Sequence, residues 1–418
     1  MKHHVLSVLW LCALSIYILA GVQHVPFHGD ESTTIWMSRD GVYIATDLQR
    51  VLYHDPPLVE TEQHLRLITG SLSKYVMATF WVLDGYHVED INDQWVWGAG
   101  WEWNHQNGHA PETRLLMISR LASALMFTAS LWVMFGIAWQ MGNPMIAYFA
   151  SLYYALNPAL LLNGRRAMFE GGLMLFSLLV ILFGVLWLKK YQSTWRWTIL
   201  LGISSGLAVS AKHPAVFTVG TIFAVCGVYA LQNRKRLLQI LVAGVLSLFV
   251  FFCLNPIWWG NPLQRAGQVL DARHELLSGQ VTAFGGYDDW QDQLAGFLRQ
   301  TFIGVPQYYE VATWENYISD QIQNYEATPW RGVVGSKLTA AILMSLVLVG
   351  GIVLWRKRLP DSRLIVIWAV MMFLFAAVLT PLEWQRYYLM TYLAVGILAS
   401  CGLLFLLEQI KLARNTST

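Results

Sequence analysis

Long uninterrupted runs of apolar residues recur along this 418-residue chain and constrain its fold more than any other feature. Several runs have about 18 to 25 residues, the length that an α-helix needs to cross a hydrocarbon core of about 30 Å. A soluble protein carries roughly 25% charged residues, whereas only 13% of this chain is charged. A transmembrane β-barrel would instead show alternating segments of about ten residues. The sequence therefore predicts an all-α polytopic membrane protein.

The apolar runs predict ten membrane spans. They lie at residues 5–22, 115–139, 143–162, 169–188, 197–211, 214–231, 237–256, 336–355, 364–381 and 387–407. The first could be read as a signal peptide, but about 18 apolar residues are long for such a segment and no small-residue cleavage site follows. The span at 197–211 is short, and only Lys212-His213-Pro214 separates it from the next. The four cysteines all lie inside apolar runs, so no disulfide framework is expected.

The distribution of Lys and Arg predicts which loops face inward. With the N-terminus inside, the inner segments hold Lys2, Lys189, Lys190, Arg196, Arg234, Lys235, Arg236, Arg356, Lys357, Arg358, Arg363, Lys411 and Arg414. The short outer loops hold only Arg165, Arg166, Lys212 and Arg386. This orientation obeys the positive-inside rule. Of the 26 Asp and Glu residues, only Asp361 and Glu408 fall inside, so the polar chemistry is expected outside.

This orientation places two long segments, 23–114 and 257–335, on the outer face. Both are rich in Trp and Tyr and lack the Gly/Ser repeats or charge blocks of disordered linkers. We predict an N-terminal transmembrane catalytic module at 1–256, an outer-face loop with short helices at 257–335, and C-terminal transmembrane helices at 336–418. Residues 70–83 could form a short helix at the membrane interface.

Four polar clusters lie near the outer ends of the predicted spans. They are Asp30-Glu31 in PFHGDESTTIW, Arg165-Arg166, Lys212-His213 and Arg386-Tyr387. An ion at the bilayer centre costs roughly 2.5 to 3.5 kcal/mol, so these groups should face protein or a water-filled cavity. Singly, such residues often snorkel or cap helices. Together, on one side, they favour a site where cations hold a phosphate and a carboxylate takes a proton from a hydroxyl.

The chain also resembles a known family, the C-type (GT-C) membrane glycosyltransferases, in particular their protein O-mannosyltransferase and aminoarabinose-transferase branch. The resemblance runs through HGDES (28–32), YHDPPL (53–58), LLNGRRAMFEGGLMLFSLL (161–179), LLGISSGLAVSAKHPAVFTVG (200–220) and TPLEWQRYYLMTYLAVGILASCGLL (380–404). The stretch at 200–220 is the most specific match. In the mannosyltransferases a lysine follows Pro-Pro-Leu almost at once, whereas here Val59 and Glu60 follow and the next lysine is Lys74.

The resemblance implies a GT-C bundle of about ten transmembrane helices that moves a sugar, with inversion, from a dolichyl or undecaprenyl phosphate to an acceptor hydroxyl. Asp30 would be the general base, and Glu31 would orient the acceptor or hold the sugar. The residues expected to hold the carrier phosphate are Arg165, Arg166, Lys212, His213, Arg386, Tyr387 and Lys74. The residues expected in the substrate loop are His54, Asp55, Trp101 and Trp103. No cofactor is implied, and neither a G-x-x-x-x-G-K-[ST] loop nor an Asp-x-Asp motif for a nucleotide sugar occurs.

The acceptor would be a protein, a lipid or a glycan, and no nucleic acid is expected as a partner. The compact loops favour a prokaryotic plasma or inner membrane, with the site on the extracytoplasmic face. The tryptophans of WVWGAGWEW (95–103) suit either a membrane-interface belt or a sugar-stacking platform.

Three alternatives remain at the level of sequence. Glu102, His105 and His109 could bind a metal only on a helix, where positions i and i+4 share a face, and Gly108 and Pro111 argue against one there. A transporter or flippase of a lipid-linked anion would share the polytopic fold, but it often shows inverted repeats and none is visible. A non-catalytic scaffold would tolerate the loss of Asp30.

Overall fold

The computed structural model of the chain describes residues 2–189 and 195–416. Every regular element in these two stretches is a helix, and no β-strand occurs in them. The predicted all-α fold is therefore confirmed. Lys190, one of the basic residues predicted for the inner side, lies outside the described residues.

Seven helices in the described stretches are long and apolar enough to cross a membrane. They are α1 (Lys2–Ala20), α8 (Thr113–Trp139), α11 (Glu170–Lys189), α14 (Arg234–Leu254), α19 (Lys337–Arg356), α20 (Pro360–Leu379) and α21 (Leu389–Thr416). An eighth candidate consists of α9 (Pro144–Leu156) and α10 (Pro158–Arg165), between which the chain bends by 62°. The bend falls where Pro158 lacks an N–H donor and restricts the residue before it. The chain is a multi-pass integral membrane protein.

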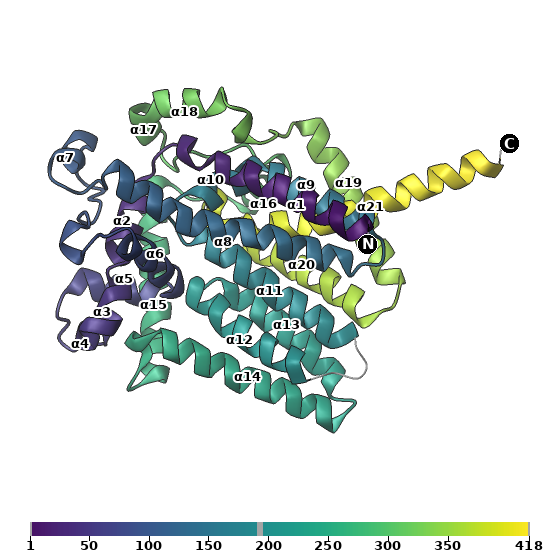
Figure 1. Cartoon of the computed structure of the whole chain (residues 1–418), viewed down its shortest axis with the longest axis horizontal. Helices are drawn as coiled ribbons and strands as arrows, with labels where there is room; N and C mark the ends of the chain where they lie inside the picture. The colour runs from purple at the N-terminus through teal and green to yellow at the C-terminus, as the bar shows by residue number, and fades with distance from the viewer. Residues whose placement is uncertain (1, 190–194, 417–418) are drawn as a thin grey trace.

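The predicted spans at 197–211 and 214–231 correspond to shorter helices, α12 (Trp195–Ala211) and α13 (Ala215–Ala230). They have 17 and 16 residues, and a straight span needs about 20. In Figure 1 both lie roughly parallel to the neighbouring long helices α11 and α14. Length and composition alone therefore establish seven or eight spans, and the predicted count of ten is not established by them.

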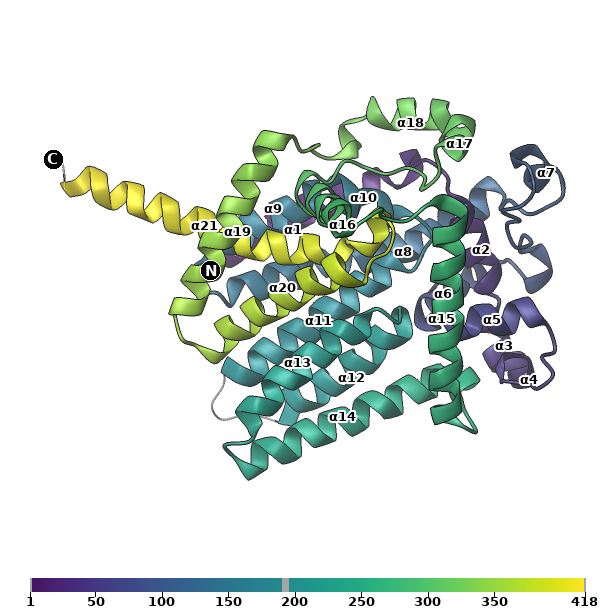
Figure 2. The ribbon, with the colours of Figure 1, turned by 180° about the vertical axis from the view of Figure 1, so that it is seen from behind.

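Short helices gather at one end of the bundle, opposite the projecting C-terminal end of α21 (Figure 1). Those from the first long segment are α2 (Gly29–Met37), α3 (Asp40–Thr46), α4 (Leu48–Val51), α5 (Glu60–Ile68), α6 (Leu72–Leu83) and α7 (Trp101–Gln106). The second long segment forms the 23-residue helix α15 (Pro262–Phe284) and the shorter helices α16 (Trp290–Leu298), α17 (Ala312–Glu315) and α18 (Ser319–Glu326). Figure 2 shows α15 running across this end of the bundle at a steep angle to the spans. The helix predicted at 70–83 is present as α6.

Small residues allow the last spans to pack backbone against backbone. A Cβ atom added at Gly350 of α19 would lie 1.9 Å from the carbonyl oxygen of Leu398 on α21. One added at Gly402 of α21 would lie 2.1 Å from that of Leu346 on α19. Close approach at small residues is the usual way in which helices associate in a membrane, where apolar burial alone drives little association. This packing fixes the position of α21, and with it the residues that directly precede it.

Candidate active site

Asp30 and Glu31 lie in the first turn of α2, which begins at an unusual cap. The His28 ring accepts a hydrogen bond from the Asp30 N–H at its Nδ1 atom, at 3.0 Å, and Glu31 accepts one from the His28 N–H at 3.1 Å. Carboxylates in a first helical turn are also favoured by the helix dipole. The Asp30 side chain is 24% exposed and the Glu31 side chain is fully buried. The two adjacent acids therefore face different surroundings.

Glu31 forms a buried ion pair with Arg120 of α8. Arg120 Nε lies 2.7 Å from Glu31 Oε1 and Nη2 lies 2.8 Å from Oε2, and the Ala167 N–H also donates to Oε1. Burial alone would raise the pKa of Glu31, but the charge and hydrogen bonds of Arg120, with Arg166 nearby, hold that pKa below its usual value. Glu31 is thus an ionised link between α2, α8 and the segment after α10.

Asp30 forms an ion pair with Arg386, which lies in the short helix η7 (Gln385–Tyr387) just before α21. Arg386 Nη1 contacts Asp30 Oδ2, and Nε lies 3.1 Å from Glu310 Oε1. Glu310 Oε2 lies 2.8 Å from His28 Nε2. Because His28 Nδ1 accepts a hydrogen bond, Nε2 carries the proton and donates to Glu310. The side chains of Asp30, Arg386, Glu310 and His28 thus form a chain of contacts that we call the Asp30 cluster, and the hydrogen bond from the Asp30 N–H to His28 joins its two ends.

The charges of the Asp30 cluster stabilise one another. Burial would raise the pKa of Glu310, but Arg386 and the hydrogen-bonded His28 outweigh it and hold that pKa well below its usual value. Burial would likewise lower the pKa of Arg386, yet Glu310 and Asp30 raise it well above its usual value. Glu310 and Arg386 are therefore both ionised at neutral pH. The ion pair with Arg386 uses Oδ2 of Asp30, and Oδ1 has no hydrogen-bond or ion-pair partner among the described residues.

A second polar group, which we call the Lys212 cluster, lies around the turn between α12 and α13. Lys212 Nζ lies 2.5 Å from Glu170 Oε1. Glu170 Oε2 and both ring nitrogens of His213 are buried and have no hydrogen-bond partner among the described residues. Burial, together with the charges of Arg273 and Lys74, lowers the pKa of His213 to about 3. Buried polar atoms without protein partners usually bind a ligand or water.

Tyr387, next to Arg386, contacts the helix α15. Its hydroxyl donates to Gln280 Oε1 on α15 at 3.1 Å, and the charges of Arg386 and Arg273 both act on it. Arg273, two turns before Gln280 on α15, donates to the carbonyl oxygen of Ile68. The charge of Arg273, a residue that sequence reasoning missed, thus acts both on Tyr387, next to Arg386, and on His213, next to Lys212.

Three other predicted phosphate ligands have their donors engaged by protein. Arg165 donates to the carbonyl oxygens of Ile18, Tyr17 and Trp330 and to the Tyr325 hydroxyl, at 2.6 to 3.0 Å. Arg166 donates to the carbonyl oxygens of Pro26 and Tyr308. Lys74 lies 3.1 Å from Asp40. All three side chains are buried, so these contacts join α1, the segment around Tyr308 and α6 to the rest of the fold.

The predicted loop residues have other partners or are exposed. His54 Nε2 bonds the Gln49 carbonyl oxygen at 2.7 Å, and Asp55 is exposed. Trp101 stacks on Tyr317 at 5.6 Å between centroids, and Trp103 stacks on His109 at 4.9 Å.

The metal alternative finds no support in the part of the chain that the structure describes, because it contains no group of three or more His, Cys, Asp or Glu side chains able to hold an ion. The helix α7 ends at Gln106, and Gly108 follows with φ +78°. His105 and His109 therefore do not share one helix face, as the glycine suggested.

Sequence reasoning missed Glu310, Arg120, Arg273 and the capping role of His28. His28 carried a signal, because it opens the HGDES stretch of the family resemblance. Arg120 and Glu31 are 89 residues apart, and Glu310 and His28 are 282 apart. No local pattern marks such distant partners, since each stands in an ordinary helical or loop sequence.

We expect the stability of the folded protein to decrease as pH falls below the ordinary His pKa of 6.5, partly through His213. Its pKa of about 3 means that the unfolded chain binds a proton between pH 6.5 and 3 and the folded chain does not. Between pH 7 and 5 this amounts to about 2 kcal/mol. Thermal unfolding of His213→Gln in detergent should lose less stability than the wild type over this interval. An equal loss in both proteins would contradict the buried, neutral imidazole.

Comparison with known proteins tests the resemblance to the membrane glycosyltransferases. A sequence model of the dolichyl-phosphate-mannose-protein mannosyltransferase (PMT) family matches residues 92–261. ArnT from Cupriavidus metallidurans in the apo state has a similar structure, with a TM-score of 0.53 and 17% sequence identity over 96% of this chain and 60% of that one. ArnT from the same organism bound to undecaprenyl phosphate has a TM-score of 0.53 and 16% sequence identity, over 95% of this chain and 60% of that one.

Archaeal oligosaccharyltransferase AglB from Archaeoglobus fulgidus, in complex with an inhibitory peptide and a dolichol-phosphate, gives a TM-score of 0.55 and 12% identity over 97% of this chain and 51% of that one. The chain thus spans 60% or less of the length of these structures. No curated protein sequence matches it. The predicted resemblance is confirmed: the PMT-family model matches residues 92–261, and the ArnT and AglB structures share the fold of this chain.

Proposed function

We propose that this protein transfers a sugar from a polyprenyl phosphate to an acceptor hydroxyl. The observation that carries the proposal is the pairing of the partly exposed Asp30 with Arg386. The charge of Arg273 acts both on Tyr387, next to Arg386, and on His213, next to Lys212, which relates this pair to the Lys212 cluster. This arrangement offers a carboxylate to accept a proton and cations to hold a phosphate. The ArnT structure that contains undecaprenyl phosphate, and the AglB structure that contains dolichol-phosphate, support a carrier of this class.

Asp30 acts in this proposal as the general base. Arg386 holds Oδ2, and Oδ1 accepts the proton of the acceptor hydroxyl as its oxygen bonds to the anomeric carbon of the sugar. The bond between that carbon and the phosphate oxygen breaks in the same step, so the configuration inverts and the electron pair leaves with the carrier phosphate. A positioned base of this kind contributes about 10² to 10⁴ in rate.

Lys212, His213 and Arg273 hold the departing phosphate. The positive groups offset the charge that develops on the leaving oxygen. The neutral His213 provides one N–H donor, and both of its ring nitrogens lack protein partners in the described structure. For Arg165, Arg166 and Lys74 we propose structural roles, since their side chains are buried and bonded to protein, whereas the side chain of Lys212 is 17% exposed. Tyr387 orients α15 relative to Arg386.

The proposed topology keeps ten spans, with α12 and α13 as a short hairpin whose turn carries Lys212 and His213. The short helices of 23–114 and 257–335 then lie on the extracytoplasmic face of a prokaryotic plasma membrane. Residues 1–256 form the N-terminal catalytic module and 336–418 carry the last spans. Asp30 lies on α2, and Ser73 of α6 donates a hydrogen bond to the carbonyl oxygen of Ala211, next to Lys212. Because α2 and α6 lie at one end of the bundle (Figure 1), these positions support the arrangement.

The test of this function is a panel of radiolabelled polyprenyl-phosphate monosaccharides, supplied to purified protein in nanodiscs with membranes as the source of acceptor. We expect label to leave one donor and appear in an acceptor, which would name the sugar. Retention of label on every donor, with acceptor membranes that support transfer in the parent organism, would contradict the proposal. Movement of intact donor across the bilayer without transfer would indicate a flippase instead.

We expect Glu310→Gln to reduce transfer by up to about 10², because misplacement of a reacting group by about 1 Å can cost this much. Glu310 holds Arg386 and His28 and does not itself reach Asp30, so its role is positioning. The turnover number should fall while the KM for the carrier stays within about twofold. Glu275→Gln, at an exposed position on α15, is the matched control. A change in KM alone would contradict the positioning role.

A further inference from the structure

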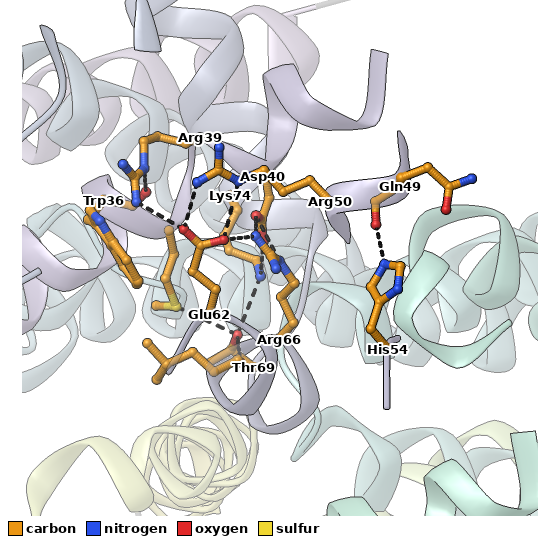
Figure 3. A network of polar contacts seen from close by, with 12 residues as sticks. Trp36, Arg39, Asp40, Gln49, Arg50, His54, Glu62, Arg66, Thr69 and Lys74 are labelled. Atoms are coloured by element: carbon orange, nitrogen blue, oxygen red, sulfur yellow. Dashed lines mark hydrogen bonds and ion pairs between the residues drawn. The ribbon is translucent and has the colours of Figure 1, made fainter. Parts of the chain in front are cut away.

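Six charged side chains between α2 and α6 form a network centred on Glu62 (Figure 3). Its inner part is tightly paired. Arg66 lies 2.7 Å from Asp40 and 2.8 Å from Glu62, and Lys74 lies 3.1 Å from Asp40. The charges of Lys74 and Arg66 outweigh burial and hold the pKa of Asp40 below its usual value. Two carboxylates thus balance two cations.

Arg39 and Arg50 are in excess over this balanced part. Both reach the same Oε1 atom of Glu62, at the long distances of 3.4 and 3.2 Å, although Glu62 is already paired with Arg66. Figure 3 shows the two guanidinium groups approaching Glu62 from the same side. Among the described residues, Nη1 of each makes no hydrogen bond. Their side chains are 15% and 36% exposed, so both can reach a ligand.

Both arginines are held in place before any ligand arrives. The Arg39 guanidinium stacks over Trp36 at 4.7 Å, and its Nε donates to the Trp36 carbonyl oxygen at 3.0 Å. The Arg50 guanidinium stacks over Tyr43 at 4.3 Å. Two like charges that share one carboxylate repel each other, and an anion between them would relieve this repulsion. Fixed side chains also lose little entropy on binding.

We propose that Arg39 and Arg50 bind a phosphate group at a site separate from the Lys212 cluster. Planar guanidinium groups with free N–H donors match the oxygens of a phosphate. The cavity of about 10 Å³ that lies among Trp36, Tyr43 and Glu62 holds about one water. The phosphate therefore lies on the exposed side of the two arginines, not between them and Glu62.

The surroundings favour a phosphate that is carried on a lipid. Leu48, two residues before Arg50 in the sequence, is 38% exposed, and Leu58 and Val59, just before α5, are 63% and 44% exposed. Exposed apolar side chains beside a basic site suit an amphipathic ligand. A free phosphate or soluble phosphate ester has the same polar group without the apolar part, and experiment can separate the two sources.

The test compares the wild type with Arg50→Gln, Arg39→Gln/Arg50→Gln and the control Arg114→Gln, an exposed arginine paired with Asp84. One arm titrates inorganic phosphate onto detergent-purified protein and follows the unfolding temperature and bound phosphate. The other compares nanodiscs of phosphatidylglycerol with nanodiscs of phosphatidylcholine and follows retained phosphatidylglycerol by native mass spectrometry. Because the partly exposed Arg50 can be changed alone, the test does not depend on the double variant folding.

We expect Arg50→Gln to weaken the binding at least tenfold in one or both arms, and Arg114→Gln to leave it unchanged. If Arg50→Gln binds inorganic phosphate more weakly than the wild type, a phosphate group alone is sufficient for binding. If it weakens only the binding of phosphatidylglycerol, the ligand is a lipid headgroup. Equal binding by wild type and Arg50→Gln in both arms would overturn the proposal. Asp30→Asn should bind normally, so this result is independent of the proposed transferase activity.

Discussion

Replacing Asp30 by Asn should reduce sugar transfer by about 10² to 10⁴ while the protein still folds. An amide keeps the shape of the side chain but cannot accept the proton of an acceptor hydroxyl. The Asp30 side chain is partly exposed, so the change leaves no uncompensated buried charge of the kind expected at Glu31. Initial rates should be measured with purified protein at saturating donor, so that the turnover number is compared and not affinity.

Asp320→Asn is the matched control for this change, because Asp320 is an exposed acid on α18. It should retain the wild-type rate. Asp30→Glu adds a test of geometry, since it keeps the base but shifts the oxygen by about one bond length, and partial activity is expected. Transfer by Asp30→Asn at a near-normal rate would remove Asp30 from the chemical step.

Replacing Glu31 by Gln should destabilise the fold by about 3 to 5 kcal/mol, because it leaves Arg120 as a buried charge without its partner. The two side chains are 0% and 4% exposed and share two short hydrogen bonds. The expected result is a large decrease in the thermal unfolding temperature in detergent, with loss of folded protein in membranes. Unlike Asp30→Asn, this change should reduce activity and folding together.

Asp84→Asn serves as the control for that measurement, since Asp84 pairs with the exposed Arg114 at 2.8 Å. Surface ion pairs contribute little to stability, so its unfolding temperature should stay close to that of the wild type. Double replacement of Glu31 and Arg120 by Gln and Met should be less harmful than Glu31→Gln alone, because the orphaned charge is gone. A fully stable, inactive Glu31→Gln would instead assign Glu31 to the chemistry.

The fold could be predicted where the signal is local. Runs of about 20 apolar residues specify spans because a helix of that length matches the bilayer, and long helices stand at eight of the ten predicted places if α9 and α10 count as one. The two spans predicted at 197–211 and 214–231 have a weaker signal, because their helices α12 and α13 are shorter than a full span. The predicted span at 143–162 is divided at Asn157-Pro158 into two helices.

The site could be predicted only in part, because sequence shows residue types and not their partners. Arg386 was expected to face the site, and its contact with Asp30 joins residues 356 apart. Arg165 carried the same signal, an arginine near the end of a span, but backbone carbonyl oxygens of α1 occupy its donors. Lys74 was expected to hold the phosphate, but it is paired with the carboxylate of Asp40, 34 residues earlier in the sequence. Whether such a basic residue can bind a ligand depends on its partners far away in the sequence, and the sequence does not show them.

The most direct test of the central claim is a cryo-EM structure of the protein with a polyprenyl phosphate bound. We predict that the phosphate lies within hydrogen-bonding distance, about 3 Å, of Lys212, His213 or Arg273. The oxygen that carries the sugar in the donor should be directed toward Asp30. The lipid chain should then leave between the spans. A phosphate bound on the opposite face of the bundle, or separated from Asp30 by the enclosed Arg165 and Arg166, would contradict it.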